Sequence, residues 1–160
     1  MIDSLYLNAM QTIFDNGLSR GPASYMCGKL ENIHSFYKVG FEHAKRSVKI
    51  VSGNLPANQF GKSPVVNSAK RALERGIYFD IFTRREPEES AFTDLLNAYN
   101  VGIRQVLPTM RNDLFSLVMI DNGISRFTEN EGIVGPAKGW IIDSRKLSRK
   151  LRVVFDKIRK

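Results

Sequence analysis

Three short apolar runs alternate with two amphipathic stretches between residues 47 and 107, and this alternation most constrains the fold. The runs Val48–Gly53, Ile77–Thr83 and Ile103–Leu107 are rich in β-branched and aromatic residues, which predicts strands. The stretches Ser63–Gly76 and Pro87–Tyr99 space apolar residues three and four apart, which predicts helices. This order is typical of parallel strands joined by right-handed crossovers. We therefore expect an α/β fold with a mixed, mostly parallel sheet and helices packed on both faces.

The second half of the chain adds strands of another kind. Leu114–Ile120 is nearly all apolar and predicts a strand buried on both faces. Asp121–Gly123 is typical of a hairpin turn, from which Ile124–Thr128 returns as an antiparallel strand. Trp140–Ile142 predicts either a short strand or the start of a final helix that ends near Ile158. The apolar side of that helix would carry Leu147, Leu151, Val154, Phe155 and Ile158.

The N-terminal part of the chain has a different pattern of apolar residues. Residues 2–15 and 23–46 carry apolar side chains at helical spacing, which predicts two helices before the first long strand. We expect an N-terminal helical segment over residues 1–40 and an α/β domain with a basic C-terminal helix over residues 41–160. A length of 160 residues is consistent with one compact unit of this kind.

The positive charge is concentrated at the C-terminal end. The chain has a formal net charge of +8, from 24 Lys and Arg against 16 Asp and Glu. Residues 145–160 contain eight basic side chains and one acidic one, Asp156, which gives +7 and leaves +1 for residues 1–144. A basic helix of this kind favours an anionic partner, nucleic acid first. The candidate polyanion-binding residues are Arg111, Arg145, Lys146, Arg149, Lys150, Arg152 and Lys157.

Several classes of protein are disfavoured. The single cysteine, Cys27, excludes an internal disulfide framework, and we expect neither a metal site nor a cofactor. The longest apolar run is Leu117–Ile120, far short of the roughly 20 residues of a membrane-spanning helix. No basic region precedes an apolar stretch near the N-terminus, so we expect a cytoplasmic protein without a membrane span.

The order of elements over roughly residues 41–158 resembles one half of the phospholipase D-like superfamily. The segments that carry the resemblance are SVKIVSGN, ALERGIYFDIFT, VGIRQVL, LFSLVMIDNG followed by ISRFT, and GWIIDS before the closing helix. In that family the signature is His-x-Lys-x4-Asp, in which the histidine attacks phosphorus and the lysine holds phosphate oxygens. The resemblance implies a homodimer as well, because family members pair two halves face to face.

The signature itself is degenerate in this sequence. If Asp121 is the motif aspartate, Leu114 stands at the histidine position and Ser116 at the lysine position. The two histidines, His34 and His43, lie outside the motif, in the N-terminal helical region. The resemblance therefore implies the fold without its phosphodiesterase chemistry, since leucine cannot attack phosphorus.

Other polar residues follow the predicted strands. Ser52 and Asn54 end the first long strand, and Arg84 and Arg85 end the second, at the edge where open α/β sheets bind ligands. Thr109, Arg111 and Asn112 precede the motif strand. The first and last of these sets have an alternative interpretation as ordinary turns. For Arg84 and Arg85 the alternative is neutralisation by the acidic side chains that follow them, Glu86, Glu88 and Glu89.

These observations favour a non-catalytic phospholipase D-like module that binds nucleic acid or another polyanion, in a regulatory or defence-related role. Three alternatives stay open. They are a dimeric protein-interaction module, a small-ligand sensor that uses the degenerate cleft, and a phosphodiesterase with an altered site at Ser116 or Asp121.

Overall fold

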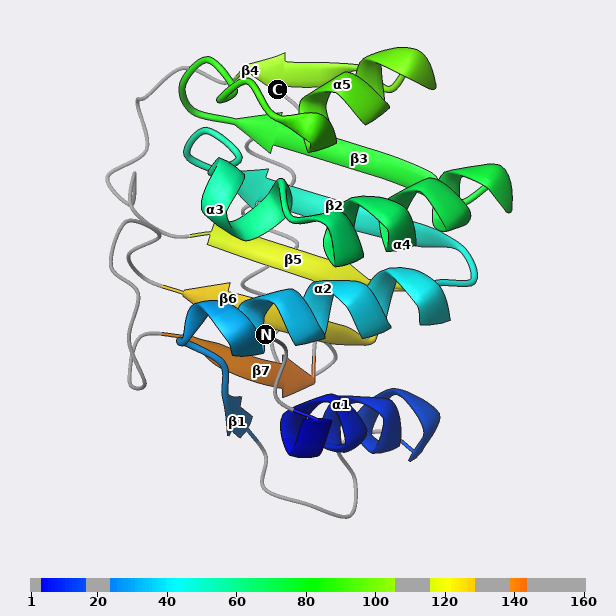
Figure 1. Ribbon diagram of the computed structural model, residues 1–160, viewed down its shortest axis with the longest axis vertical. Coiled ribbons are helices and arrows are strands. Elements are labelled where there is room, and N and C mark those ends of the chain that lie inside the picture. The colour runs from blue at the N-terminus through cyan, green and yellow to red at the C-terminus, as the bar shows by residue number, and fades with distance from the viewer. Residues whose placement is uncertain (1–3, 17–23, 106–115, 129–138, 144–160) are drawn as a thin grey trace.

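The computed structural model describes residues 4–16, 24–105, 116–128 and 139–143 (Figure 1). The helices are α1 Ser4–Asn16, α2 Leu30–His43, α3 Ala57–Phe60, α4 Ser63–Glu74 and α5 Ala91–Ala98. The strands are β1 Ser24–Met26, β2 Ser47–Ser52, β3 Tyr78–Thr83, β4 Ile103–Gln105, β5 Ser116–Ile120, β6 Ile124–Thr128 and β7 Trp140–Asp143.

The seven described strands form one sheet in the order β1-β7-β6-β5-β2-β3-β4. Only β2 with β3 and β3 with β4 pair in parallel. The other four pairs are antiparallel, so the expectation of a mostly parallel sheet is wrong. The strand–helix alternation fixes the direction of β2, β3 and β4 only. Because β5 joins the free edge of β2 in the opposite direction, the hairpin that follows it extends the sheet with antiparallel strands.

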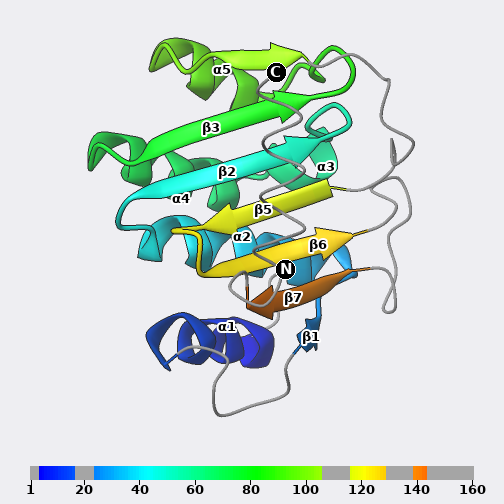
Figure 2. The same ribbon diagram turned by 180° about the vertical axis from the view of Figure 1, so that it is seen from behind.

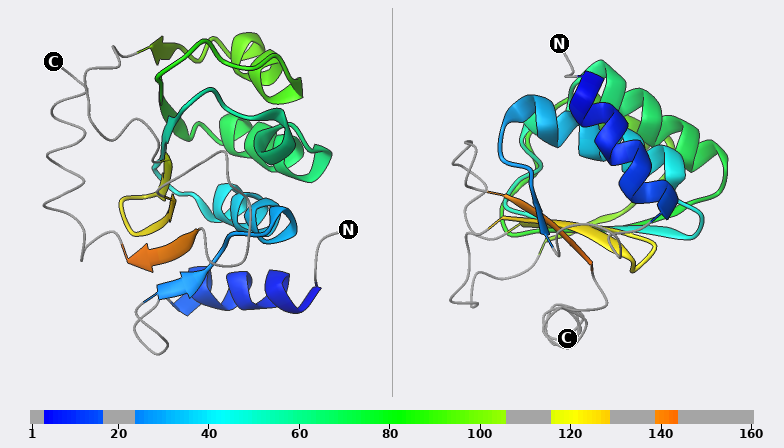
Figure 3. Two further views of the ribbon diagram at one scale, coloured as in Figure 1. Left: turned by 90° about the vertical axis from the view of Figure 1, so that its left-hand side faces the viewer. Right: turned by 90° about the horizontal axis from the view of Figure 1, so that it is seen from below.

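The described helices lie on one face of the sheet, as Figure 1 and the end-on view in Figure 3 show. Helices on both faces were expected, but the predicted closing helix falls in residues 144–160, outside the described part of the chain. None of the described helices is long and apolar enough to cross a bilayer.

The N-terminal segment differs from its prediction. A continuous helix was expected over 23–46, but β1 occupies Ser24–Met26 and α2 begins at Leu30. The short strand β1 pairs antiparallel with β7, so a partner far along the chain sets its structure. Residues 140–143 are the strand β7, which decides between the two alternatives for that segment. The predicted boundary after residue 40 falls inside α2.

The hairpin turn at Asp121–Gly123 is confirmed. Asp121 and Asn122 have φ angles of 56° and 58°, and the Gly123 N–H donates to the Ile120 carbonyl (2.9 Å). Positive φ at both central residues defines the turn that best matches the twist of paired strands. This turn connects β5 to β6 at the end of the sheet where β2 begins.

Aromatic rings fill the space between α2, α3, α5 and the sheet. Tyr37 stacks on Phe60 with ring centroids 4.7 Å apart, and Phe60 contacts Phe92 at 5.1 Å. Tyr37 and Phe41 are also stacked, at 5.8 Å. Buried aromatic rings contribute large apolar areas and favoured ring geometries, so this cluster anchors the helix layer on the sheet.

Candidate functional site

A row of polar side chains crosses the sheet at the carboxyl end of β2 and β3. Thr83 is in register with Ser52 on β2 and with Gln105 on β4, and Ser116 is opposite Thr128 on β6. Extending the β2–β5 register by one residue places Ser52 opposite Ser116. Residues directly opposite each other project from the same face of a sheet. We call Ser52, Thr83, Ser116 and Thr128 the hydroxyl row.

The hydroxyl row faces the helix layer. Residues two apart on a strand project from the same face of the sheet. Each member of the row lies two residues from a side chain that packs beneath the helices. Those neighbouring side chains are Ile50, Ile81, Val118 and Arg126. The same row continues from Thr128 through Gly139 to Cys27, whose N–H donates to the Gly139 carbonyl (2.8 Å).

Two hydroxyls of the row are buried without a hydrogen-bond partner in the part of the chain that the structure describes. They are Thr83 Oγ1, on a residue with 0% exposure, and Ser116 Oγ, on a residue with 3% exposure. Ser52 Oγ, between them, accepts a hydrogen bond from the Leu55 N–H (2.9 Å). Buried polar atoms are nearly always satisfied, so two hydroxyls without partners in one row are exceptions that call for an explanation.

The sequence-predicted motif residues lie at opposite ends of β5. Ser116 begins the strand within the hydroxyl row, Asp121 follows its other end, and Leu114 falls outside the described residues. Asp121 follows Ser116 by five residue steps, which correspond to about 17 Å of extended strand. The two residues therefore do not form one catalytic site.

Asp121 has a structural role at the start of β2. Its carboxylate accepts hydrogen bonds from the backbone N–H groups of Lys45 (2.9 Å), Arg46 (2.7 Å) and Ser47 (3.0 Å). These are charge-assisted bonds, which are stronger than neutral ones. Asp121 thus joins the β5–β6 turn to the segment that leads into β2.

Both histidines have hydrogen-bond partners away from the hydroxyl row. His34 Nε2 contacts the Asn58 carbonyl (2.6 Å), and burial lowers the pKa of His34 more than that carbonyl raises it. His43 Nδ1 contacts the Val39 carbonyl (3.0 Å), and its Nε2 contacts Asp15 Oδ1 (2.9 Å). Neither ring contacts Asp121 or a member of the hydroxyl row through these bonds.

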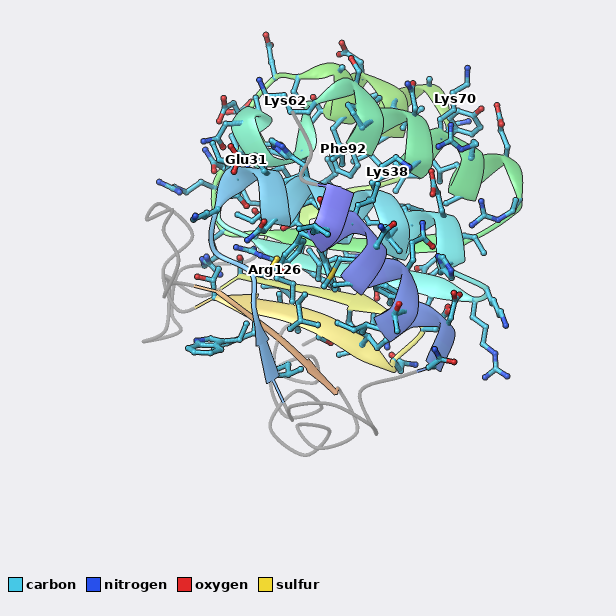
Figure 4. The ribbon with its side chains drawn as sticks, turned by 60° about the horizontal axis from the view of Figure 1, so that its bottom comes forward. Glu31, Lys38, Lys62, Lys70, Phe92 and Arg126 are labelled. Carbon is cyan, nitrogen blue, oxygen red and sulfur yellow. The ribbon has the colours of Figure 1, made fainter. Side chains whose placement is uncertain are left out.

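Arg126 is a buried cation beside the hydroxyl row that was not predicted from the sequence. Its side chain is 3% exposed, its Nε donates to the Cys27 carbonyl (3.1 Å), and its Nη1 donates to Tyr37 Oη (3.3 Å). Figure 4 shows Arg126 beneath the helix layer. The available signal was the alternation of β6, which places residue 126 on the same face as Thr128.

Electrostatics keep Arg126 charged and Cys27 neutral. Burial lowers the pKa of Arg126, but Tyr37 and Cys27 outweigh burial and leave that pKa above its usual value. Burial raises the pKa of the Cys27 thiol, and Arg126 only partly opposes this. A buried thiol with a raised pKa is a poor nucleophile.

The ends of β2 and β3 meet at one edge, as predicted. The Arg84 N–H donates to the Ser52 carbonyl (3.1 Å), the Arg85 N–H to the Gly53 carbonyl (2.8 Å), and the Glu88 N–H to the Asn54 carbonyl (2.7 Å). These contacts tie the two strand ends together through the backbone. Among the described residues, no group of three or more His, Cys, Asp or Glu side chains could hold a metal ion.

The predicted polyanion-binding residues lie outside the described part of the chain. The same holds for the candidate polar turn before β5. The residues concerned are Thr109, Arg111, Asn112, Arg145, Lys146, Arg149, Lys150, Arg152 and Lys157.

The architecture is similar to two solved structures. Nuc from Salmonella typhimurium, a phospholipase D family member, matches with a TM-score of 0.54 and 10% sequence identity, over 76% of this chain and 83% of Nuc. TrmBL2, an archaeal chromatin protein with a novel mode of DNA binding, matches with a TM-score of 0.52 and 10% identity, over 94% of this chain and 59% of TrmBL2. No protein-family model and no curated protein sequence matches the chain. At this identity the two likenesses establish architecture alone, and the chain has a phospholipase D-like α/β fold.

Proposed function

We propose that the protein is a non-catalytic phospholipase D-like module that binds nucleic acid or another polyanion through its basic C-terminal segment. The observation that carries the proposal is the concentration of charge, since residues 145–160 hold +7 of the net +8. A cluster of this kind neutralises phosphates and releases their counterions, which drives binding to nucleic acid. The fold it shares with TrmBL2, a DNA-binding chromatin protein, supports the same proposal.

The non-catalytic part of the proposal is supported by the composition of the hydroxyl row. The family's chemistry requires a histidine nucleophile and a lysine, at positions that Leu114 and Ser116 occupy in this sequence if Asp121 is the motif aspartate. The four members of that row carry hydroxyls, and the described residues that continue it across the sheet are Gln105, Gly139 and the buried Cys27. A serine without a general base is a weak nucleophile near neutral pH.

The decisive experiment measures the salt dependence of DNA binding. The variant replaces Arg149, Lys150, Arg152 and Lys157 by Gln, and fluorescence anisotropy follows a labelled 20-base-pair duplex between 50 and 200 mM NaCl. Each lost phosphate contact should lower the slope of log affinity against log salt by about 0.9. The matched control replaces four exposed cations of the described part and removes the same charge. These are Lys29, Lys45, Lys62 and Lys70.

The control should keep the wild-type slope. An equal decrease of the slope in both variants would show that binding depends on net charge alone, and it would contradict the assignment to residues 145–160. Catalysis is tested separately with bis-p-nitrophenyl phosphate, for which we expect no turnover. Turnover that Ser116→Ala abolishes would overturn the non-catalytic proposal.

A small-ligand role is a second candidate, and the two open hydroxyls of Thr83 and Ser116 favour it. A polar ligand that bonds both would raise the melting temperature by binding only the folded state. Inorganic phosphate and nucleoside monophosphates are suitable probes in a thermal-shift assay. Ser116→Ala and Thr83→Val should remove any such shift.

We also propose that the protein forms a homodimer, as the resemblance to paired phospholipase D halves implies. Sedimentation velocity at micromolar concentration measures this directly. A single species at the monomer mass of 18.1 kDa would reject it.

A further inference from the structure

Arg126 is a buried cation whose contacts with the described residues are all to neutral groups. They are the Cys27 carbonyl and thiol, and the hydroxyl and ring of Tyr37. Within the described part of the chain, the ion pairs join other residues. An arginine that is 3% exposed is nearly always paired with an anion, because an uncompensated charge is costly to remove from water. Arg126 therefore has no counterion within the described ranges.

One end of the Arg126 guanidinium lies at the hydroxyl row. The bonds to the Cys27 carbonyl and the Tyr37 hydroxyl engage Nε and Nη1. The third nitrogen, Nη2, lies close to Gly139, since a Cβ atom there would be 3.1 Å from it. Gly139 follows Thr128 in the hydroxyl row, so Nη2 is positioned at that row.

A hydroxyl without a partner lies on the other side of Thr128 in the same row. Ser116 is opposite Thr128, is 3% exposed, and its Oγ has no hydrogen-bond partner in the part of the chain that the structure describes. Figure 2, which views the sheet from behind, shows β5, β6 and β7 side by side with α2 beyond them. A cation without a counterion and a hydroxyl without a partner thus flank Thr128 beneath one helix layer.

The strand spacing limits the size of a ligand that satisfies both groups. Gly139 and Ser116 are two strand steps apart, which corresponds to about 10 Å. Two hydrogen bonds of about 2.8 Å each leave roughly 4 Å between the two polar groups of the ligand. A carboxylate and a hydroxyl are separated by this much in a short hydroxy acid.

The single cation favours a ligand with one negative charge. A carboxylate has one charge and two coplanar oxygens that match the guanidinium fork. A phosphate monoester has nearly two negative charges at neutral pH. It would leave one of them uncompensated, because the four members of the hydroxyl row provide no second cation. A neutral ligand hydroxyl suits Ser116, which also carries no charge.

We propose that the protein binds a small hydroxy acid beneath the helix layer, with the carboxylate on Arg126 and the hydroxyl on Ser116. The ligand lies across Thr128 in the hydroxyl row. It supplies the counterion for Arg126 and the hydrogen-bond partner for Ser116. This proposal deepens the second candidate function, a small-ligand role, and rests on that role and not on nucleic-acid binding.

Matched ligands test the proposal in the wild-type protein, without DNA. The (R) and (S) forms of 3-hydroxybutyrate are compared with butyrate, which lacks the hydroxyl, and with 3-hydroxybutyramide, which lacks the charge. Isothermal titration calorimetry at pH 7 measures each affinity, with ionic strength held constant by sodium chloride. One form of 3-hydroxybutyrate should bind about tenfold more tightly than butyrate, and the amide should not bind. Equal binding of acid and amide, or no binding of either acid, would overturn the proposal.

Ser116→Ala tests the hydroxyl contact and should leave the fold intact, because the hydroxyl that it removes has no partner among the described residues. In this variant 3-hydroxybutyrate should bind only as tightly as butyrate, and butyrate should bind as it does to the wild type. Wild-type affinity for 3-hydroxybutyrate would contradict the assignment of Ser116. This variant and the ligand comparison keep the proposal testable if substitution of Arg126 prevents folding.

Arg126→Lys keeps the positive charge and removes the guanidinium fork. Both acids should then bind about tenfold more weakly. Arg104→Lys is the matched control, because the Arg104 guanidinium lies over the Phe82 ring, 5.7 Å from its centroid, and it should leave both affinities unchanged. Equal losses in the two variants would contradict the assignment of Arg126.

The proposals fail in distinguishable ways. Hydroxy-acid binding in a protein without affinity for DNA would reject nucleic-acid binding and leave this site intact. DNA binding without a response to either acid would do the reverse. A thermal shift with phosphate that requires Ser116 but not Arg126 would support a small-ligand role and overturn the hydroxy acid.

Discussion

At the residue scale, the most informative positions are polar side chains that are buried between the sheet and the helices. The hydroxyl row and Arg126 stand in neighbouring rows of the sheet, beneath the helix layer. Each residue type was visible in the sequence, but the row depends on the register between β2 and β5, which are far apart in the chain. The alternation of apolar and polar residues along one strand predicts which face of the sheet a residue lies on. It does not predict which residue of the next strand lies beside it.

Thr83→Val tests whether the Thr83 hydroxyl is a structural cost. Valine keeps the shape and removes an unsatisfied buried hydroxyl, so the free energy of unfolding should rise by about 1 kcal/mol. Thr93→Val is the matched control. Its hydroxyl donates to the Ser90 carbonyl (3.0 Å) and accepts from the Ser90 N–H (2.9 Å), so the same substitution should lower stability by about 1 kcal/mol. Urea unfolding measures both, and a destabilised Thr83→Val would show that this hydroxyl has a partner.

Arg126→Met tests the buried cation. The substitution leaves the Cys27 carbonyl and Tyr37 hydroxyl without their donor, and we expect a loss of about 2–4 kcal/mol. Tyr37→Phe removes the hydroxyl that accepts the longer of the two Arg126 bonds (3.3 Å) and should cost about 1 kcal/mol. A loss in Arg126→Met no larger than that in Tyr37→Phe would contradict a role for the Cys27 contact, by the same unfolding measurement.

At the element scale, the sequence predicted helices and strands well where residues within or next to the element determine its structure. Pro64 lies in the first turn of α4, as predicted. The helix expected from Pro87 begins at Ala91 instead, where Ser90 caps α5 by accepting from the Phe92 and Thr93 N–H groups. Prediction failed at β1, because three residues form a strand only when β7 pairs with them. The four-residue helix α3 was also missed, since so short an element has no periodic pattern.

Glu42 links α2 to α4 and should make this contact depend on pH. Burial raises the pKa of Glu42, but hydrogen bonds from Arg71, Lys38 and Ser68 outweigh it, and the pKa ends below its usual value of 4.5. The stabilisation is therefore complete above about pH 4.5 and is lost as the pH falls through the lower folded-state pKa.

Glu42→Gln measures this contribution. We expect a loss of about 1 kcal/mol at pH 7 and a smaller loss at pH 3, from urea unfolding at both values. Glu89→Gln, an exposed loop position, should change little at either pH. A loss for Glu42→Gln that is independent of pH would contradict the titration argument.

At the scale of the whole molecule, the α/β class was predictable and the sheet topology was not. The crossover rule identified β2, β3 and β4 as parallel neighbours, and the turn signal identified the β5–β6 hairpin. Nothing local in the sequence shows that β5 pairs with β2, which turns a mostly parallel sheet into a mostly antiparallel one. The motif positions followed from the family resemblance; the structure places Ser116 and Asp121 at opposite ends of β5, and Leu114 lies outside the described residues.

The late position of β5 has a consequence for synthesis. Ser47 and the Asp121 carboxylate that receives its N–H are 74 residues apart. At about 5–20 residues per second, the ribosome takes roughly 4–15 seconds between them. During that interval the central strand β2 presents a bare edge to other nascent chains, and such edges invite aggregation. The emerging polypeptide therefore carries this unpaired edge until its own fifth strand has been synthesised.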